Sequence, residues 1–269
     1  MFCPARWSRL RARSSMHLLT RVVVGTAVLA ALPALAFAQK STIPMNGLSG
    51  PALASGGDLP HGLSVDQIVA RLTAANKRRT DDLKGYTEER RYSVTYHGFP
   101  ASLSATMVVE ATYEAPETKH FRIVSLTGSK LLGDRVLKRL LSTEETAAHN
   151  PQETALNAEN YSFTLVGEQS VDGRPCYLLE VVPKTDSKLL YHGTIWVDAG
   201  DFAVKKIDAE PARNPSFWIR STEIHHVYAK TGPFWLPEHN ESDTRVRLGG
   251  SAVLTIDYGA YQTTTMAAR

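Results

Sequence analysis

Residues 102–113 have the sequence SLSATMVVEATY, in which apolar and polar side chains alternate along nearly the whole length. Successive side chains of a β-strand point to opposite faces, so a period of two indicates a strand buried on one face. The apolar positions share one parity: Leu103, Ala105, Met107, Val109, Ala111 and Tyr113. We therefore expect a strand here whose Leu103, Met107 and Val109 face inward.

The segments on both sides of this stretch show the same alternation. Before it, the apolar side chains of residues 86–96 share one parity: Tyr86, Tyr92, Val94 and Tyr96. After it, from about residue 119 to 126, Phe121 and Ile123 alternate with polar neighbours. The short connection Gly98-Phe99-Pro100 is typical of a turn between antiparallel strands.

The C-terminal half repeats the strand pattern. We expect further strands near residues 160–168, 174–183, 190–198, 202–210, 216–230, 234–247 and 251–261. With two or three helices, this pattern indicates a sheet-dominated α+β protein. Some strands are apolar on both faces, because Trp196 opposes Ile195 and Trp218 opposes Phe217. A strongly curved antiparallel sheet with helices covering its concave face would bury both faces.

Two segments have helical spacing. Ser64 and Gln67 form a capping box at the start of a helix that Gly85 should end. In residues 131–148, Leu132, Val136 and Leu140 recur every four residues. The other side of this helix is expected to carry its charged residues, namely Arg135, Lys138, Arg139, Glu144 and Glu145. Such a helix either packs as part of the core or covers the sheet as a movable lid.

The N-terminus has the features of a signal peptide. Residues 1–38 contain five arginines and no acidic residue, then an apolar run that ends in Ala36-Phe37-Ala38. We expect cleavage after Ala38, with Met1 or Met16 as the start; an uncleaved anchor is the alternative. Residues 39–62, rich in Ser, Pro and Gly, are expected to form a flexible leader, and residues 63–269 a single domain.

Cleavage would change the charge balance. The full chain has 30 Lys and Arg against 27 Asp and Glu, and loss of the five arginines leaves 25 against 27. The precursor's basic character therefore gives no reason to expect a nucleic-acid partner. Cys176 is the one cysteine after Ala38, so neither an internal disulfide nor a cysteine-based metal site is expected.

No sequence motif indicates catalysis or a cofactor. Gly47-Leu48-Ser49-Gly50 lacks the spacing of a nucleophile elbow, and no glycine-rich phosphate loop is present. His225 and His226 are adjacent in a predicted strand and should point to opposite faces, so they cannot chelate one ion together. We expect no catalytic residues, no metal and no cofactor.

Several segments together resemble a known family. They are Tyr86-x-x-x-Arg90-Arg91-Tyr92, residues 119–123 (KHFRI), 177–184 (YLLEVVPK), 195–198 (IWVD), 202–207 (FAVKKI) and 232–237 (GPFWLP). Their order, with a helix before the first segment and another after the second, resembles the LolA-like outer-membrane lipoprotein-sorting proteins of the LolA/LolB/RseB/LppX superfamily. The resemblance covers about residues 63–262.

The resemblance implies a half-open β-barrel with a cavity for acyl chains or for a lipid-modified protein. It also implies an arginine that contacts the lid, for which Arg90 and Arg91 are both candidates. The expected ligand-contacting side chains are Tyr92, Met107, Leu132, Val136, Leu140, Trp196 and Trp218. If the helix is a lid, Leu132, Val136 and Leu140 should point toward the strands that bear the two tryptophans, for which core packing is the alternative role.

These observations favour a periplasmic or otherwise extracytoplasmic carrier of lipid or lipoprotein, not an enzyme. Burial of acyl chains would drive binding at about 0.8 kcal/mol per CH₂ group. The expected partners are acyl chains or a lipidated protein, with an inner- or outer-membrane protein as receptor and the carrier itself monomeric. An envelope-stress sensor that binds another protein and a secreted hydrolase without a recognisable motif are the alternatives.

Overall fold

The computed structural model describes residues 62–116, 118–148, 151–214, 216–247 and 249–265. The expected signal peptide and nearly all of the leader lie outside these ranges. The described strands are β1 (Leu83–His97), β2 (Leu103–Glu114), β3 (Thr118–Gly128), β4 (Tyr161–Val171), β5 (Arg174–Pro183), β6 (Tyr191–Asp198), β7 (Val204–Pro211), β8 (Ile219–Thr231), β9 (Phe234–Val246), β10 (Ser251–Tyr258) and β11 (Gln262–Thr265).

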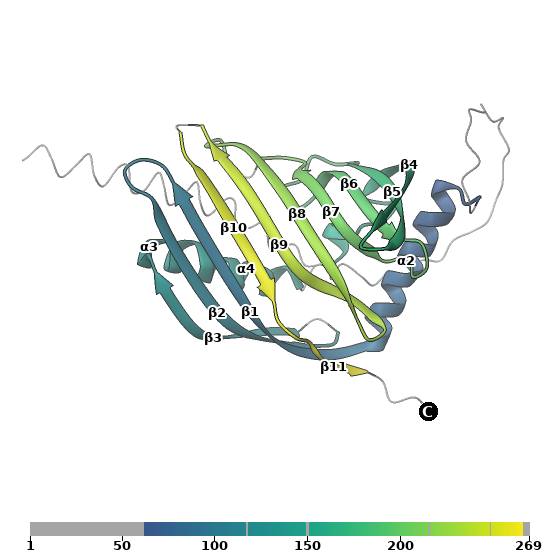
Figure 1. Cartoon of the computed structure of the whole chain (residues 1–269), viewed down its shortest axis with the longest axis horizontal. Helices are drawn as coiled ribbons and strands as arrows, with labels where there is room; N and C mark the ends of the chain where they lie inside the picture. Colours follow the sequence, from purple (N-terminus) through teal and green to yellow (C-terminus); the bar gives the residue numbers. More distant parts are fainter. Residues whose placement is uncertain (1–61, 117, 149–150, 215, 248, 266–269) are drawn as a thin grey trace, which may run out of the picture.

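The strands form one antiparallel sheet in the order β3-β2-β1-β10-β9-β8-β7-β6-β5-β4, and β11 pairs with β1 beyond the end of β10. Within the described residues β3 and β4 are the edges, so the sheet is open (Figure 1). The expected sheet-dominated α+β class is confirmed, and the strand positions agree closely with the sequence pattern.

The register expected for β2 is also confirmed. Met107 and Val109 are fully buried and Leu103 is half-buried, whereas Ser104 is exposed. The register differs from the expectation at residues 217–218, where β8 begins only at Ile219. In a turn there, the Ile219 amide donates to the Ser216 carbonyl oxygen at 3.1 Å, and this turn places Phe217 and Trp218 before the strand.

Cross-strand register places one set of side chains on the same face of the sheet. Tyr92 of β1 lies opposite both Met107 and Ile256, and the row continues through β9, β8, β7, β6 and β5 as Asn240, His226, Ile207, Ile195 and Leu179. This face carries two apolar clusters. We call them the β1–β2–β10 cluster, around Tyr92 and Met107, and the β5–β6–β7 cluster, around Leu179 and Ile195.

The first helix, α2 (Val65–Asp82), packs on the β5–β6–β7 cluster. Its capping box is present, and Ile68 and Leu72 are fully buried. The helix ends at Asp82, before the expected stop at Gly85, because β1 already begins at Leu83. Gly85 instead serves close strand packing, since a Cβ there would lie 2.8 Å from the Tyr113 carbonyl oxygen.

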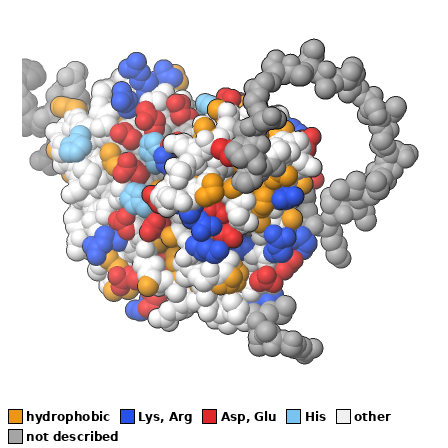
Figure 2. Space-filling view, turned by 45° about the vertical axis from the view of Figure 1, so that its right-hand side comes forward, with side chains coloured by type: hydrophobic (Ala, Val, Ile, Leu, Met, Phe, Trp, Pro, Cys, Tyr) orange, Lys and Arg blue, Asp and Glu red, His pale blue; other side chains and the backbone are white. Residues whose placement is uncertain are grey.

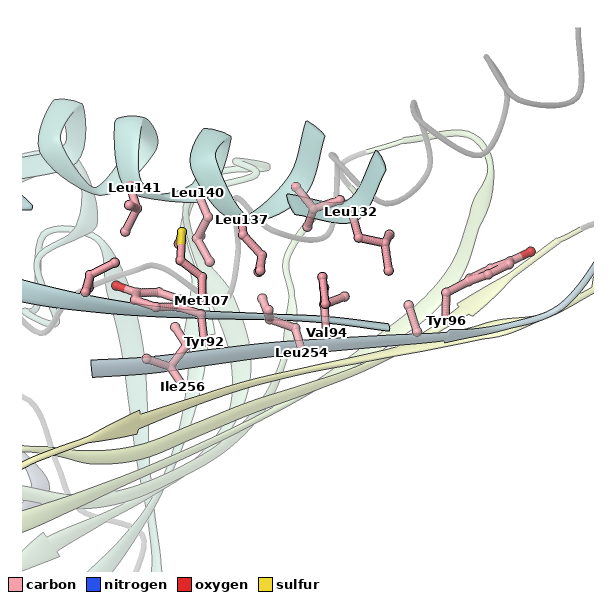
Figure 3. Close-up of a cluster of buried hydrophobic side chains, with 14 residues drawn as sticks. Tyr92, Val94, Tyr96, Met107, Leu132, Leu137, Leu140, Leu141, Leu254 and Ile256 are labelled. Atoms are coloured by element: carbon pink, nitrogen blue, oxygen red, sulfur yellow. The ribbon is translucent and has the colours of Figure 1, made fainter. Parts of the chain in front are cut away.

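The second helical segment packs on the β1–β2–β10 cluster. It consists of α3 (Lys130–Leu132), the π-helical turn η1 (Gly133–Leu137) and α4 (Lys138–Ala148), followed by the 3₁₀ turn η2 (Pro151–Thr154). The side chains that face the sheet are Leu132, Val136, Leu137, Leu140 and Leu141 (Figure 3). None of the helices in the described ranges is long and apolar enough to cross a membrane.

The expectation that this helix faces the strands of Trp196 and Trp218 is wrong. Its apolar side chains meet Val94, Met107 and Leu254 of β1, β2 and β10 instead. The reason is the connection: Ser129 alone separates β3 from α3, so the helix turns back over the strands next to β3.

Candidate functional site

The site is built around Arg90, in the middle of β1. Its side chain lies on the helix-covered face, and the residue is only 1% exposed. Arg91 points to the other face and is exposed. Because neighbouring strand residues alternate, Arg90 is the one of the two candidate arginines that meets the helix.

Arg90 joins three other charged side chains in what we call the Arg90 network: Glu88, Arg90, Lys119 and Glu144. Arg90 Nη1 donates to Glu144 Oε2 at 2.8 Å, and Lys119 Nζ donates to the same oxygen at 3.1 Å. Arg90 Nε donates to Glu88 Oε1. All four residues are at most 5% exposed. The two positive and two negative charges leave the network with no net charge, and they connect β1 and β3 to α4.

Aromatic side chains enclose the network. The Tyr92 hydroxyl donates to Glu144 Oε1 at 2.8 Å, and Arg90 Nη2 donates to the Tyr86 hydroxyl at 3.3 Å. The guanidinium carbon lies 4.6 Å from the Tyr258 ring centroid and 5.5 Å from that of Phe121. A guanidinium over aromatic faces keeps part of its stabilisation when water is excluded.

The two carboxylates of the network have opposite pKa shifts. Burial alone would raise the pKa of Glu144, but Lys119 and Arg90 outweigh burial and hold it below its ordinary value. Burial raises the pKa of Glu88, because Arg90 compensates it only in part and Glu88 Oε2 has no hydrogen-bond partner among the described residues. Glu144 is therefore the firmly ionised anchor on the helix side.

Buried ion pairs of this kind determine geometry more than they add stability. Desolvation of the four charges offsets most of their attraction, but removal of one partner typically costs about 3–5 kcal/mol because another charge is left unpaired. The Arg90 network thus fixes where α4 lies on the sheet, while the apolar side chains supply the burial energy.

The predicted ligand-contacting residues fall into two groups. Tyr92, Met107, Leu132, Val136 and Leu140 are all at most 2% exposed and lie in the β1–β2–β10 cluster, where helix and sheet fill each other's surface (Figure 3). A ligand could reach Met107 only if the helix moved. The structure brings these five residues together.

The two tryptophans lie elsewhere. Trp196 is half-buried on the opposite face from Ile195, where its Nε1 donates to Gln169 Oε1 at 2.8 Å and Lys206 Nζ lies 4.6 Å from its ring centroid. Trp218 is half-buried against Phe217 in the segment before β8. Neither belongs to the β1–β2–β10 cluster.

The helix has an irregular turn above this cluster. The π-helical turn η1 inserts extra backbone between α3 and α4, a feature frequent at functional sites. At its start Gly133 approaches β3 so closely that a Cβ would lie 3.0 Å from the Leu126 side chain. Leu132 before this turn and Leu140 after it both face the sheet.

The adjacent histidines point to opposite faces, as expected. His226 is buried on the helix-covered face, and His225 on the other face has its Nδ1 2.8 Å from Asp208 Oδ1. In the described part of the chain, no group of three or more His, Cys, Asp or Glu side chains is placed to hold a metal ion.

Sequence reasoning missed three of the four members of the network. Glu144 was expected on the charged side of the helix, and this is wrong, since it is 1% exposed. The spacing of Glu144 could have indicated its burial, because residues 132, 136, 140 and 144 form one row four residues apart. Glu88 likewise shares the inward parity of Tyr86, Arg90 and Tyr92.

Comparison with known proteins gives distant structural likenesses. No protein-family model and no curated protein sequence matches the chain. It is similar to a putative outer membrane lipoprotein-sorting protein domain from Vibrio parahaemolyticus (10% identity, 75% of this chain and 94% of that chain, TM-score 0.40). A DUF1329 family protein from Desulfovibrio piger (15% identity, 76% and 95%, TM-score 0.38) and a LolA superfamily protein from Nitrosomonas europaea (14% identity, 77% and 96%, TM-score 0.33) are also similar.

Two of these three solved structures are described as a lipoprotein-sorting protein domain and as a LolA superfamily protein. Identities of 10–15% and TM-scores of 0.40 or below mark distant likeness. The contacts within this chain therefore carry the argument for what the site binds.

Proposed function

We propose that the chain is an extracytoplasmic, non-enzymatic binding protein that holds an apolar ligand between the sheet and the helical segment 130–148. The ligand would be an acyl chain or the lipid group of a lipidated protein. The helix-covered face would then be the concave face of a half-open barrel, and the predicted signal peptide would direct the chain out of the cytoplasm.

One observation carries the proposal: a short amphipathic helix lies on the apolar β1–β2–β10 cluster and is joined to the sheet by a buried charge network. Displacement of the helix would expose Val94, Met107 and Leu254 together, and acyl chains would gain about 0.8 kcal/mol for each CH₂ group that they bury there. Displacement separates Glu144 on α4 from Arg90 and Lys119 on the sheet, and water that enters can then solvate the separated charges.

The charges on the outer surface do not suggest a nucleic-acid partner. Basic and acidic side chains are interspersed on the face seen in Figure 2. Such a mixed surface offers no strong field for nucleic acid. A membrane protein would deliver the ligand to the carrier or receive it from the carrier.

The neighbouring arginines provide a matched test. Arg90→Met removes the buried guanidinium and leaves Glu88 and Glu144 facing Lys119 alone, whereas Arg91→Met makes the same substitution at an exposed position. We expect amide exchange in residues 130–148 to rise about 100-fold in Arg90→Met, in line with about 3 kcal/mol for a broken buried pair. Arg91→Met should exchange like the wild type.

Ligand binding is measured on the same proteins with a fluorescent fatty-acyl probe. The probe should bind wild type and Arg91→Met, and its binding should raise exchange in 130–148 while the rest of the sheet stays protected. Absence of probe binding, or exchange of 130–148 only together with global unfolding, would contradict the carrier function. A stable complex with an envelope protein and no bound lipid would favour the sensor alternative.

A further inference from the structure

A polar strip crosses the helix-covered face between the two apolar clusters. It consists of His226 on β8 and Asn240 and Ser242 on β9, and we call it the β8–β9 strip. Register places Asn240 between Ile256 of β10 and His226, and places His226 next to Ile207 of β7. The sequence expectation of an apolar groove does not account for these polar residues.

Each residue of the strip has a buried polar atom without a partner. His226 Nε2, Asn240 Oδ1 and Ser242 Oγ make no hydrogen bond within the described ranges, and the three residues are 4%, 3% and 0% exposed. An unsatisfied buried polar atom costs about 1–3 kcal/mol, and native proteins contain few of them. Three on one patch of a sheet therefore indicate that they are satisfied in another state.

The nearest polar pair on the same two strands is satisfied, unlike the strip. Thr222 and Thr244 pair through their hydroxyls at 3.0 Å. Asn240 Nδ2 donates to the Tyr258 hydroxyl at 2.9 Å, which fixes the amide so that Oδ1 is the atom left to accept a hydrogen bond. The Asn240 amide is thus oriented by its contact with Tyr258.

The strip carries no charge. Burial lowers the pKa of His226 to about 4, so the imidazole is neutral near pH 7. Asn240 contacts Tyr258, and the Tyr258 ring in turn contacts the guanidinium of Arg90. The charge of Arg90 is already balanced by Glu88 and Glu144. An anionic or a cationic head group would find no opposite charge left to pair with it, whereas hydroxyl or amide groups could donate to Oδ1 and exchange hydrogen bonds with Oγ and Nε2.

We propose that the β8–β9 strip binds the neutral, hydroxyl-bearing head group of an amphiphile whose acyl chain lies along the adjoining apolar cluster. This inference rests on the proposed carrier function and specifies its ligand class. Asn240 Oδ1 accepts a hydrogen bond from a head-group hydroxyl, and Ser242 and His226 each donate a hydrogen bond to the head group or accept one from it.

The test compares head groups on one chain length. Monododecanoylglycerol, dodecanoate and dodecyltrimethylammonium, each below its micelle concentration, compete with the fluorescent acyl probe on the mature protein. We expect monododecanoylglycerol to bind at least tenfold more tightly than the two charged amphiphiles. Ser242→Ala and Asn240→Leu should each reduce this preference about three- to tenfold, as expected for loss of one buried hydrogen bond, without weakening dodecanoate.

Glu241→Gln, on the same strand but pointing to the other face, is the matched control and should keep the wild-type preference. Equal affinity for all three amphiphiles would overturn this inference and leave the carrier function standing, whereas failure of all three to bind would overturn both. Variants that gain stability but keep the head-group preference would show that the strip binds only internal water. Ser242→Ala, the smallest change, keeps the test valid if Asn240→Leu does not fold.

Discussion

Glu144 links the helix to the sheet through contacts with three different residues. Arg90 and Lys119 reach one carboxylate oxygen, and the Tyr92 hydroxyl donates to the other. Glu145, its neighbour, is half-buried and forms no ion pair within the described residues. This difference between adjacent glutamates makes them a useful pair for substitution.

We expect Glu144→Gln to destabilise the protein by about 3 kcal/mol, because Glu88 is then the one anion left in the Arg90 network to balance Arg90 and Lys119. Urea unfolding measures the change, and Glu145→Gln should alter the free energy of unfolding by less than about 0.5 kcal/mol. A loss of similar size in both variants would show that the network has no special role.

The Glu144 carboxyl also predicts how the helix responds to acid. Its pKa in the folded protein is lower than the ordinary 4.5, so its contribution is fully present above pH 4.5 and is lost as the pH falls through the lowered value. Amide exchange of 130–148, corrected for the intrinsic pH dependence, should therefore rise below pH 4.5. Glu144→Gln should lack this rise; if it retains it, another group is responsible. Glu88 has the opposite shift, so its protonation begins above 4.5 and does not weaken the fold.

His226 gives a second pH dependence at higher pH. Its pKa falls from 6.5 to about 4 on folding, so the unfolded chain takes up a proton in this interval and the folded chain does not. The free energy of unfolding should fall by up to about 3 kcal/mol between pH 6.5 and pH 4. The slope should disappear in His226→Phe and persist in His192→Gln, whose side chain is exposed. An unchanged slope in His226→Phe would assign it elsewhere.

At this scale the sequence predicts parity well and partners poorly. Alternation predicted that Tyr92 and Met107 face inward and that His225 and His226 point to opposite faces of the sheet. The structure confirms both predictions. The same alternation could have selected Arg90 over Arg91. The partners of Arg90 could not be predicted, because Glu144 lies 54 residues away and its burial depends on how the helix docks.

Among the elements, the helical segment 130–148 has the most to test. Val136 is 2% exposed against the β1–β2–β10 cluster, so Val136→Asp would bury an unpaired carboxylate at the contact. We expect exchange in 130–148 to rise by the equivalent of a few kcal/mol while the sheet stays folded. Retention of the acyl probe should weaken, because the new carboxylate would face the acyl chain held between helix and sheet.

Arg139→Asp is the control for this substitution, since it places the same side chain on the exposed side of the same helix. It should leave both exchange and probe retention near the wild-type values. If Val136→Asp unfolds the whole domain, the helix is part of the core; if it changes neither measurement, the helix covers no binding groove.

Element positions followed from local patterns, but their irregularities did not. The capping box at Ser64 and the alternation of residues 103–113 are short-range signals, and both are realised. The π-helical turn η1 begins at Gly133, which lies close to Leu126, and beyond the early end of α2 Gly85 lies close to Tyr113. Such contacts exist only after the sheet has formed.

For the whole molecule, the decisive feature is a pairing between the two ends of the domain. β1 pairs with β10 across residues 90–97 and 251–258, which sets the N-terminal strands beside the last ones. The sequence predicted antiparallel strands but not this long-range order, because local alternation is the same for every neighbour. The order is what puts both apolar clusters on one face.

The two helices therefore have separate roles on one sheet. α2 packs on the β5–β6–β7 cluster and donates from Arg79 Nη1 to the Trp235 carbonyl oxygen, whereas α4 packs on the β1–β2–β10 cluster beside the Arg90 network. The β8–β9 strip lies between them. We expect α2 to stabilise the domain as a whole and the α4 segment to open locally.

This division predicts additive effects on stability. Leu72→Ala on α2 should reduce the free energy of unfolding by about 2–5 kcal/mol, the usual result of truncating a fully buried leucine, and should leave local exchange of 130–148 unchanged relative to the rest of the sheet. Combined with Arg90→Met, the two losses should sum to within about 0.5 kcal/mol, because the residues share no cluster. Urea unfolding of both single variants and the double variant measures the coupling. A coupling above about 1 kcal/mol would mean that the two clusters behave as one core, and the helical segment 130–148 could then not open while α2 stays packed.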